Sequence, residues 1–396
     1  MQEVYIVSAV RTPMGRFGGI LSSFSPVELG ASVIKAALER GGVSGKDLDL
    51  YIFGNVLGAG HGQSLSRQAA IKAGIPKTVN GYGVNMVCSS GMMAAINAAT
   101  AIRVGEADLV IAGGIESMSQ TGFLLSHRAR WGYKSLFGSP EQVTDIVIRD
   151  GLTDPITSEA MGEQAERLAQ EYRVSRAQLD EVAHRSQSRA ALATINNFFK
   201  SEIVPMEVKE KKALRLVDQD EGIRHNSTLE SFAKLNPAFN PDGVFTAGNS
   251  SQLSDGAAAL CIASKEAVER YGLKPVARVL GSTTAAVETW RFLESPVFAV
   301  KMLLEKLNLK SNDFDLFENN EAFALSNVLF KNMLEITDEN LNVNGGAIAL
   351  GHPIGASGAR ILVTLINALQ QKDGHRGMAA ICHGTGGGTA FALERI

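Results

Sequence analysis

Short apolar runs alternate with longer segments of helical periodicity along most of the chain. The runs at Val4–Val10, Leu109–Ala112 and Met378–Ile381 each have the composition and length of a buried strand. Buried strands that alternate with helices are typical of mainly parallel sheets covered by helices on both faces. The pattern therefore predicts an α/β fold.

Helix-start signals occur in similar form near both ends of the chain. Ser25, Pro26 and Glu28 form a capping-box pattern with proline at the first helical position, and the helical pattern extends to about Arg40. The same Ser-Pro-Val opening recurs at 295–297 and begins another predicted helix. That helix is expected to end near residue 307.

Further segments match in the same order, about 265 to 270 residues apart. Asp47–Tyr51 is similar to Asp313–Phe317, and Cys88 and His352 each precede a predicted helix. We interpret the series as a duplicated α/β unit, in which a pseudo-twofold axis would bring the two turns face to face. Chance matching of common dipeptides is the alternative.

Residues 121–243 interrupt this repeat. The stretch is richer in Arg, Lys, Glu and Gln, and it contains a long helical pattern from Ser175 to Lys200 that starts with a capping box of Ser175 and Gln178. We interpret it as an inserted, mostly helical loop domain that lies over the first half and covers a ligand or mediates assembly. The predicted organisation is a first half at 1–120 and 244–271, the insert at 121–243, and a second half at 272–396.

Composition narrows the class of partner. The chain of 396 residues has a formal charge of -3 and a pI near 6.2, without a block of like charges, which argues against nucleic acid and anionic membranes. No apolar segment reaches the roughly 18 residues of a membrane span, and the N-terminus lacks a targeting pattern. Three cysteines make no disulfide framework and suit a reducing compartment. We expect a cytoplasmic protein that acts on a small molecule.

Cys88 is the first candidate for chemistry. It lies where a short apolar strand turns through Ser89, Ser90 and Gly91 into a helix of small residues. The positive end of a helix dipole lowers the pKa of a thiol and favours the nucleophilic thiolate. We therefore predict that Cys88 is a nucleophile rather than a buried structural cysteine.

Other polar groups lie on separate turns. His352, in a glycine-rich stretch, can exchange protons near neutral pH. Cys382 follows an apolar strand and precedes glycines whose N–H groups can stabilise an oxyanion, and Asn320 offers an amide at the end of another strand. A metal site is the rival interpretation, but His383 adjoins Cys382 too closely and no Cys-x-x-Cys pair exists, so no metal is expected.

These motifs together resemble the thiolase family. The resemblance runs from Val7–Pro13 to Cys382–Gly386 and includes Asn-Glu-Ala-Phe at 320–323, in the same order. It implies a duplicated αβαβα fold with two five-stranded, mainly parallel sheets and a loop domain between them. This architecture agrees with the repeat and the insertion.

The resemblance also implies a role for each side chain. Cys88 would attack an acyl-CoA thioester while His352 accepts its proton, and Cys382 would remove or return a proton on the α-carbon of a second acetyl group. One oxyanion hole would consist of His352 and a water held by Asn320. The other would consist of the backbone N–H groups of Cys88 and Gly384.

Contacts to the substrate follow from the same resemblance. Arg224 would meet the nucleotide end of CoA, and Ser231 and Ser251 would meet its pantetheine or adenine region. Met161 and Phe323 would line the acyl pocket. CoA would be substrate and product, and no separate cofactor is implied.

Three departures from the family pattern concern the acyl pocket and the second cysteine turn. Ala160 replaces a usual histidine before Met161, the loop Thr283–Glu294 lacks a Met-Gly pattern, and Thr385 interrupts the glycines after Cys382. These differences leave the preferred acyl length open.

The expected reaction is the reversible condensation of two acetyl-CoA to acetoacetyl-CoA and CoA. A degradative thiolase for longer or bulkier 3-ketoacyl-CoAs is the nearest alternative, because of the loop differences. A decarboxylating ketosynthase is disfavoured by the cysteine at 382, and a non-catalytic CoA or lipid binder is the alternative from another class. The resemblance implies a homodimer, and residues 120–140 would support a homotetramer.

Overall fold

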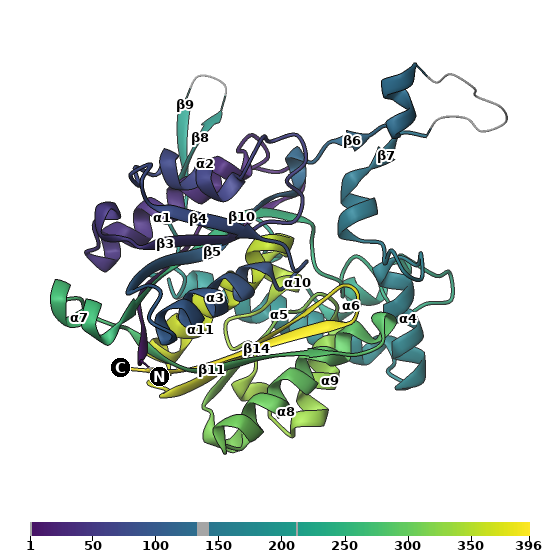
Figure 1. Ribbon diagram of the computed structural model, residues 1–396. Helices are drawn as coiled ribbons and strands as arrows, with labels where there is room; N and C mark the ends of the chain where they lie inside the picture. Colours follow the sequence, from purple (N-terminus) through teal and green to yellow (C-terminus); the bar gives the residue numbers. More distant parts are fainter. Residues whose placement is uncertain (1, 133–141, 211–212) are drawn as a thin grey trace.

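Two sheet regions and three helical layers alternate in the computed structural model, which describes residues 2–132, 142–210 and 213–396 (Figure 1). The first half contains β1 (Val4–Arg11), β2 (Gly15–Arg16), α1 (Pro26–Gly41), β3 (Leu50–Gly54), α2 (Leu65–Lys72), β4 (Asn80–Val84), α3 (Ser90–Arg103), β5 (Leu109–Ser117), β10 (Ser254–Ser264) and α7 (Lys265–Tyr271). The second half contains β11 (Ala277–Ala286), α8 (Ser295–Leu307), β12 (Leu316–Asn319), α9 (Ala324–Leu334), α10 (Ala347–Leu350), α11 (Ile354–Gln371), β13 (Arg376–His383) and β14 (Gly387–Arg395).

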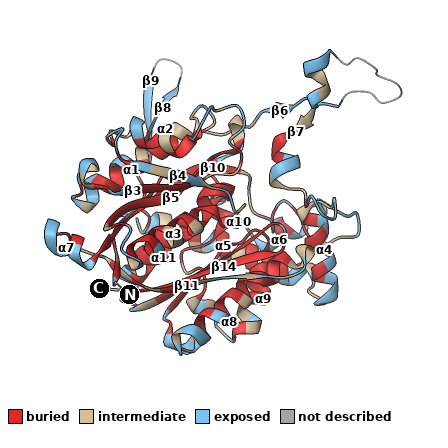
Figure 2. Ribbon diagram, in the orientation of Figure 1, coloured by how far each residue is buried: buried red, intermediate tan, exposed pale blue. Residues whose placement is uncertain are grey.

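The stretch between β5 and β10 carries helices and two small hairpins. Its elements are β6 (Phe123–Leu124), β7 (Thr144–Asp145), α4 (Met161–Glu171), α5 (Arg176–Ile195), β8 (Met206–Glu210), β9 (Ala213–Val217) and α6 (Leu229–Ala233). The β6–β7 ladder extends away from the body, and its surface is largely exposed (Figure 2). The helices α4, α5 and α6 pack beside the second half, so the expectation that they lie over the first half is wrong.

The strand order repeats in the two halves. Within the described residues, a ten-stranded sheet runs in the order β12-β13-β14-β11-β1-β10-β5-β3-β4, and β2 pairs with β10. Outward from the β11–β1 junction, β11-β14-β13-β12 therefore corresponds to β1-β10-β5-β3. The repeat found in the sequence has this structural counterpart.

The expectation of mainly parallel sheets is wrong. Only the pairs β3–β4, β3–β5 and β12–β13 are parallel, whereas β10 and β14 pair with antiparallel neighbours on both sides. The turn at Gly384–Gly386 joins β13 directly to β14, and so short a connection permits only antiparallel pairing. In the first half the insert occupies the corresponding junction, between β5 and β10.

Two separate five-stranded sheets are not present either. The halves are joined by pairing of Tyr5 with Arg278 and Ile6 with Ala277, and the fifth strand of the second half is reduced to a bridge between Phe317 and Leu341. Asn342 ends this bridge because it adopts a left-handed φ of 48°. Its side-chain amide instead bonds the backbone N–H and C=O of Asn319.

Local helix signals are largely confirmed. Ser25 and Glu28 form the expected capping box of α1, as Ser175 and Gln178 do for α5, and α8 ends at Leu307. The long helix ends at Ile195 rather than Lys200. Asparagines favour helix ends, and here Asn196 caps α5 before Asn197 takes a left-handed φ of 58°.

The helices α3 and α11 lie side by side between the two sheet regions (Figure 1). Small residues allow this approach: a Cβ added at Gly358 would lie 2.4 Å from the Met92 nitrogen, and one at Gly91 would lie 2.8 Å from the Ala359 nitrogen. Gly91 also approaches the Gly355 carbonyl, so the helices are adjacent near their N-termini. The turns that precede α3 and α11 therefore meet.

Apolar packing fixes the outer layers. One cluster joins α1 and α2 to the outer face of the first half, and another joins α8 and α9 to the second half. The central layer and the inner strand faces are buried, as the red core in Figure 2 shows. Among the described residues, no helix is long and apolar enough to cross a membrane.

Candidate active site

A cavity of about 340 Å³ opens where the α3 and α11 turns, the end of β13 and the insert meet. Seven of the ten site residues expected from the sequence line it: Cys88, Met161, Ser251, Phe323, His352, Cys382 and Gly384. Asn320 is buried directly behind His352. Only Arg224 and Ser231 lie elsewhere.

The turn that holds Cys88 is fixed by Ser90. The Ser90 hydroxyl accepts from the Met86 N–H at 2.8 Å and donates to the Val87 carbonyl at 2.6 Å. Val87 adopts φ +47°, an unfavourable conformation for a β-branched residue, which costs about 1–3 kcal/mol. Strain of this kind is maintained where the surrounding structure requires it, and here it precedes the half-buried thiol of Cys88.

The expectation that the helix N-terminus lowers the pKa of Cys88 is wrong in sign. Burial raises the pKa of this thiol to about 12, although hydrogen bonds from the N–H groups of Gly384 and of Cys88 itself act in the opposite direction. Desolvation of a thiolate outweighs these two donors. The resting side chain is therefore a thiol that needs a base.

His352 lines the same cavity and is held in a fixed position. Its backbone N–H bonds the Gln252 carbonyl and the Ser254 hydroxyl, and Gly351 before it has φ +112°, where a Cβ would lie 2.4 Å from Ser254 Oγ. Burial and the charge of Arg360 lower the pKa of His352 to about 3, so the imidazole is neutral.

Ser357 determines which ring nitrogen of His352 is free. Ser357 Oγ lies 2.6 Å from His352 Nδ1 and 3.0 Å from the Pro353 carbonyl. If the hydroxyl donates to the carbonyl, it accepts from Nδ1–H, and Nε2 keeps a free lone pair. The sequence interpretation missed Ser357, whose only signal was its place five residues after His352 in the glycine-rich stretch.

Cys382 is fully buried at the end of β13 and lines the same cavity. Burial raises the pKa of its thiol well above the usual range, and the charge of Cys88 raises it further, which places the two sulfurs within electrostatic reach of each other. The adjacent Gly384 directs its N–H at the Cys88 sulfur. Two thiols, an imidazole and two N–H donors thus converge.

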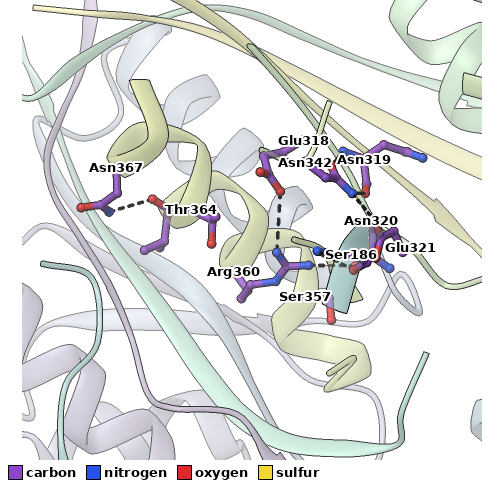
Figure 3. Close-up of polar contacts among 12 residues, drawn as sticks. Ser186, Glu318, Asn319, Asn320, Glu321, Asn342, Ser357, Arg360, Thr364 and Asn367 are labelled. Carbon is purple, nitrogen blue, oxygen red and sulfur yellow. Dashed lines mark hydrogen bonds and ion pairs between the residues drawn. The ribbon is translucent and has the colours of Figure 1, made fainter. Parts of the chain in front are cut away.

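Asn320 contacts His352 but does not itself line the cavity. Its Nδ2 lies 3.4 Å from His352 Nδ1, and its Oδ1 accepts from Arg360 Nη2 at 3.3 Å (Figure 3). Glu321, the next residue, accepts from Ser186, Asn327, Asn342 and the Ile348 N–H. Glu321 therefore holds elements together, whereas Asn320 faces the site.

Glu116 was also missed from the sequence. Its buried carboxylate accepts from the N–H groups of Val56, Leu57 and Gly355 and from the Asn55 amide. Burial raises the pKa of Glu116 to about 7 despite these donors. The carboxylate ties the start of α11 to the first half, and no pattern along the sequence indicates such a long-range contact.

Arg224 and Ser231 line a second cavity of about 450 Å³ with His225, Asn226, Ser227, Phe232 and Leu235. The Ser231 hydroxyl accepts from the Thr228 N–H at 3.1 Å in the capping box of α6, and it donates to the Thr228 carbonyl at 2.6 Å. The two cavities are neighbours: Ala247 lines the first, and a Cβ on Gly248 would lie 2.5 Å from Leu235 of the second.

The wall of the first cavity is mostly apolar. Phe323 packs edge to face on Phe239, Phe245 and Phe292, at centroid distances of 5.3 to 6.2 Å. Met161 lies opposite Gly384, about 3.6 Å from where its Cβ would be. Among the described residues, no group of three or more His, Cys, Asp or Glu side chains is placed to hold a metal ion.

Fold and site together define a two-half α/β protein with a cysteine–histidine centre between its halves. The sequence profile of the thiolase N-terminal domain matches residues 4–266, and that of the thiolase C-terminal domain matches residues 273–395. The chain belongs to the thiolase family, which confirms the resemblance.

Individual relatives are similar to this chain over all or nearly all of their length. An acetyl-CoA acetyltransferase of Synechocystis sp. is 61% identical over 396 residues, which is all of both chains. The crystal structure of an acetyl-CoA acetyltransferase of Bacillus anthracis is similar over 100% of this chain and 99% of that one, with a TM-score of 0.96 and 40% identity. A thiolase of Ascaris suum in complex with coenzyme A covers 100% of both chains, with a TM-score of 0.93 and 40% identity.

Proposed function

We propose that the chain is an acetyl-CoA C-acetyltransferase, which condenses two acetyl-CoA to acetoacetyl-CoA and CoA and also catalyses the reverse thiolysis. The observation that carries the proposal is the convergence of Cys88, His352, Cys382 and the Gly384 N–H on one apolar cavity. The names of the full-length relatives from Synechocystis and Bacillus anthracis support the same activity.

In the first half-reaction Cys88 Sγ attacks the thioester carbonyl and its proton passes to His352 Nε2. The tetrahedral oxyanion is stabilised by the N–H groups of Cys88 and Gly384, which already hydrogen-bond the sulfur. Collapse breaks the carbon–sulfur bond to CoA. The departing thiolate takes the proton of Cys382, which leaves an acetyl-Cys88, an imidazolium and a Cys382 thiolate.

In the second half-reaction the Cys382 thiolate removes an α-proton from a second acetyl-CoA. The raised pKa of Cys382 makes its thiolate a strong base, and an acetylated Cys88 cannot ionise, so no thiolate charge at Cys88 opposes the formation of this base. The enolate oxygen is held by His352 and by a water on Asn320. Attack of the enolate on acetyl-Cys88 forms the new carbon–carbon bond, and the expelled Cys88 thiolate recovers its proton from His352.

The two neighbouring cavities differ in character, as do the acyl end and the nucleotide end of a CoA thioester. The apolar cavity beside Cys88, with Ser251, Met161 and Phe323, would receive the acyl group and part of the pantetheine. The neighbouring cavity, with Arg224 and Ser231, would receive the nucleotide end, where a guanidinium complements phosphate. CoA bound to the Ascaris relative supports this choice of ligand.

The separate roles of Cys88 and Cys382 are tested by measuring acylation and condensation independently. The protein is incubated with acetyl-CoA, and peptide mass mapping then locates the acetyl group. Cys88→Ala should abolish acetylation, and Cys382→Ser should retain acetyl-Cys88 while losing condensation. Equal loss of both steps in Cys382→Ser would refute these roles, and an unmodified Cys88 in the unaltered protein would favour a binder without catalytic activity.

The preferred acyl-chain length of the substrate is tested by a separate measurement. Ala160 stands in the cavity wall where relatives commonly carry histidine, and Phe292 of the altered loop also lines the wall. The kcat/KM values for a series of 3-ketoacyl-CoAs should be highest for acetoacetyl-CoA. A maximum at longer chains would assign the protein to the degradative thiolases.

We also propose a homodimer or homotetramer in a reducing compartment such as the cytoplasm. All three cysteines are free, β4 forms an open sheet edge, and apolar side chains are exposed on the β6–β7 arm. Residues 133–140 of the stretch expected to support a tetramer lie outside the described residues. The assembly is tested below.

A further inference from the structure

We infer that Arg360 is a positioning residue for the condensation step: its guanidinium sets the orientation of the Asn320 amide, so that the amide NH₂ group faces His352. Arg360 is on α11, two turns after His352, and its side chain is fully buried. The inference rests on the role of Asn320 proposed above, and it adds a residue that does not touch the substrate.

The contact with Arg360 favours one orientation of the Asn320 amide. A guanidinium carries donors and no acceptor, whereas an amide has a carbonyl oxygen on one side and an NH₂ group on the other. Arg360 Nη2 lies 3.3 Å from Asn320 Oδ1. A rotated amide would place two donor groups against each other in a buried site, with its oxygen towards His352.

The orientation matters because an enolate oxygen, or the water that stabilises it, needs a donor. With Oδ1 committed to Arg360, Nδ2 is the only polar group that Asn320 can present on the His352 side, and it lies 3.4 Å from the ring. Nδ1 of that ring is satisfied by Ser357 at 2.6 Å. The amide hydrogens are therefore free for a third partner.

Glu318 keeps the arginine in place without competing for the amide. Its carboxylate lies 3.8 Å from Arg360 Nη1, from the end of β12 that also carries Asn320 (Figure 3). Among the described residues, Arg360 Nε and Nη1 and both Glu318 oxygens have no hydrogen-bond partner. Burying an arginine with so few hydrogen bonds costs free energy of folding, which indicates that Arg360 has a function other than stabilising the fold.

A second effect of Arg360 concerns the resting state of His352, before the first half-reaction. Its charge contributes, after burial, to the low pKa of His352. The other charged groups near Arg360 are Arg11, Glu202, Glu318 and Glu321. The resting imidazole is thus kept neutral, as the first proton transfer from Cys88 requires.

The test is a double-mutant cycle in a background that leaves no buried carboxylate unpaired. Glu318→Gln is the reference, and Arg360→Met, Asn320→Ala and both together are added to it. Acetylation of Cys88 is followed by peptide mass, condensation by formation of acetoacetyl-CoA, and folding by the thermal midpoint. Arg360→Lys in the unaltered protein is the conservative variant, since an ammonium also has donors only.

Arg360→Met should slow condensation about tenfold and change acetylation less than about threefold, because a single oriented donor is lost. Adding it to Asn320→Ala should cost nothing further, since the amide it orients is gone. Arg360→Lys should recover most of the rate.

Three outcomes separate the inference from the proposed function. If Asn320→Ala condenses normally, the proposed role of Asn320 fails and the inference falls with it. If Asn320→Ala is slow and Arg360→Met is normal, only the inference is overturned. Equal slowing of both steps, or a further tenfold loss in the combined variant, would show that Arg360 acts on the fold and not through the amide.

Discussion

Burial decides the protonation state of each reacting side chain. Cys88 and Cys382 remain thiols and His352 remains an unprotonated imidazole, because a desolvated charge costs more than a few hydrogen bonds return. In the resting site, Cys88 and His352 therefore do not form a thiolate–imidazolium ion pair. In the proposed mechanism, the nucleophilic thiolate forms when the Cys88 thiol passes its proton to the His352 imidazole during attack.

Alkylation of Cys88 checks this state directly. A thiol with a pKa near 12 has a thiolate fraction that grows about tenfold per pH unit across pH 7 to 10, so its alkylation rate should rise without a plateau. The measurement is the second-order rate constant with iodoacetamide, determined for the Cys88 peptide by mass spectrometry. His352→Asn should give the same slope, and a plateau below pH 8 that disappears in this variant would establish a preformed thiolate–imidazolium pair instead.

The sequence predicted which reactive side chains form the site, but it did not predict the direction in which their pKa values shift. Cys88, His352 and Cys382 stand out in the sequence because reactive side chains on glycine-rich turns are uncommon. The sign of the Cys88 pKa depends on how much water the completed fold excludes. Glu116 contacts Gly355 of the other half, and Arg360 contacts Asn320 at a separation of 40 residues, so only the folded chain brings these groups to the site.

Elements with local signals were predicted well. The capping boxes at Ser25 and Ser175 involve residues three positions apart, so the sequence alone contains the whole motif. Strand direction in β10 and β14 depends on turns and pairing partners, and the parallel expectation failed there. The lost strand at Leu341 also escaped prediction, because one asparagine conformation replaces its backbone pairing.

The crossing of α3 and α11 can be tested by adding one methyl group. Gly358→Ala would place a Cβ 2.4 Å from the Met92 nitrogen and 2.8 Å from its Cβ, and overpacking of this kind costs about 1–3 kcal/mol. Guanidinium denaturation at fixed protein concentration should show the loss, and acetylation of Cys88 should slow because α3 shifts from α11. Gly45→Ala is the control, since its nearest neighbour would be 3.5 Å away. Unchanged stability of Gly358→Ala would mean that the helices separate freely.

The insert lies between β5 and β10 of the first half. At the corresponding position, the second half has only the tight turn between β13 and β14. The chain leaves β5, builds the arm, the helices around the cavity and the β8–β9 hairpin, and returns in β10 (Figure 1). The site thus combines both halves with a wall from the insert, including Met161. The described part of the arm carries exposed apolar side chains.

Exposed aromatic residues on the arm predict assembly beyond a dimer. Phe123 and Trp131 are 68% and 69% exposed, which is costly unless a second copy covers them. Replacing both by Ser should reduce a tetramer to a dimer in light scattering, with activity per chain largely retained. Ile195→Ser, at a residue 70% exposed on α5, is the control and should not change the mass. A monomeric unaltered protein would contradict the proposal.

The contact of β1 with β11 involves two residue pairs, yet it closes the inner margin of each half. If the chain were cut between Tyr271 and Ala277, the separated pieces would each present an open strand edge as a template for aggregation. Each half therefore shields a sheet edge of the other, in addition to contributing side chains to the shared cavity.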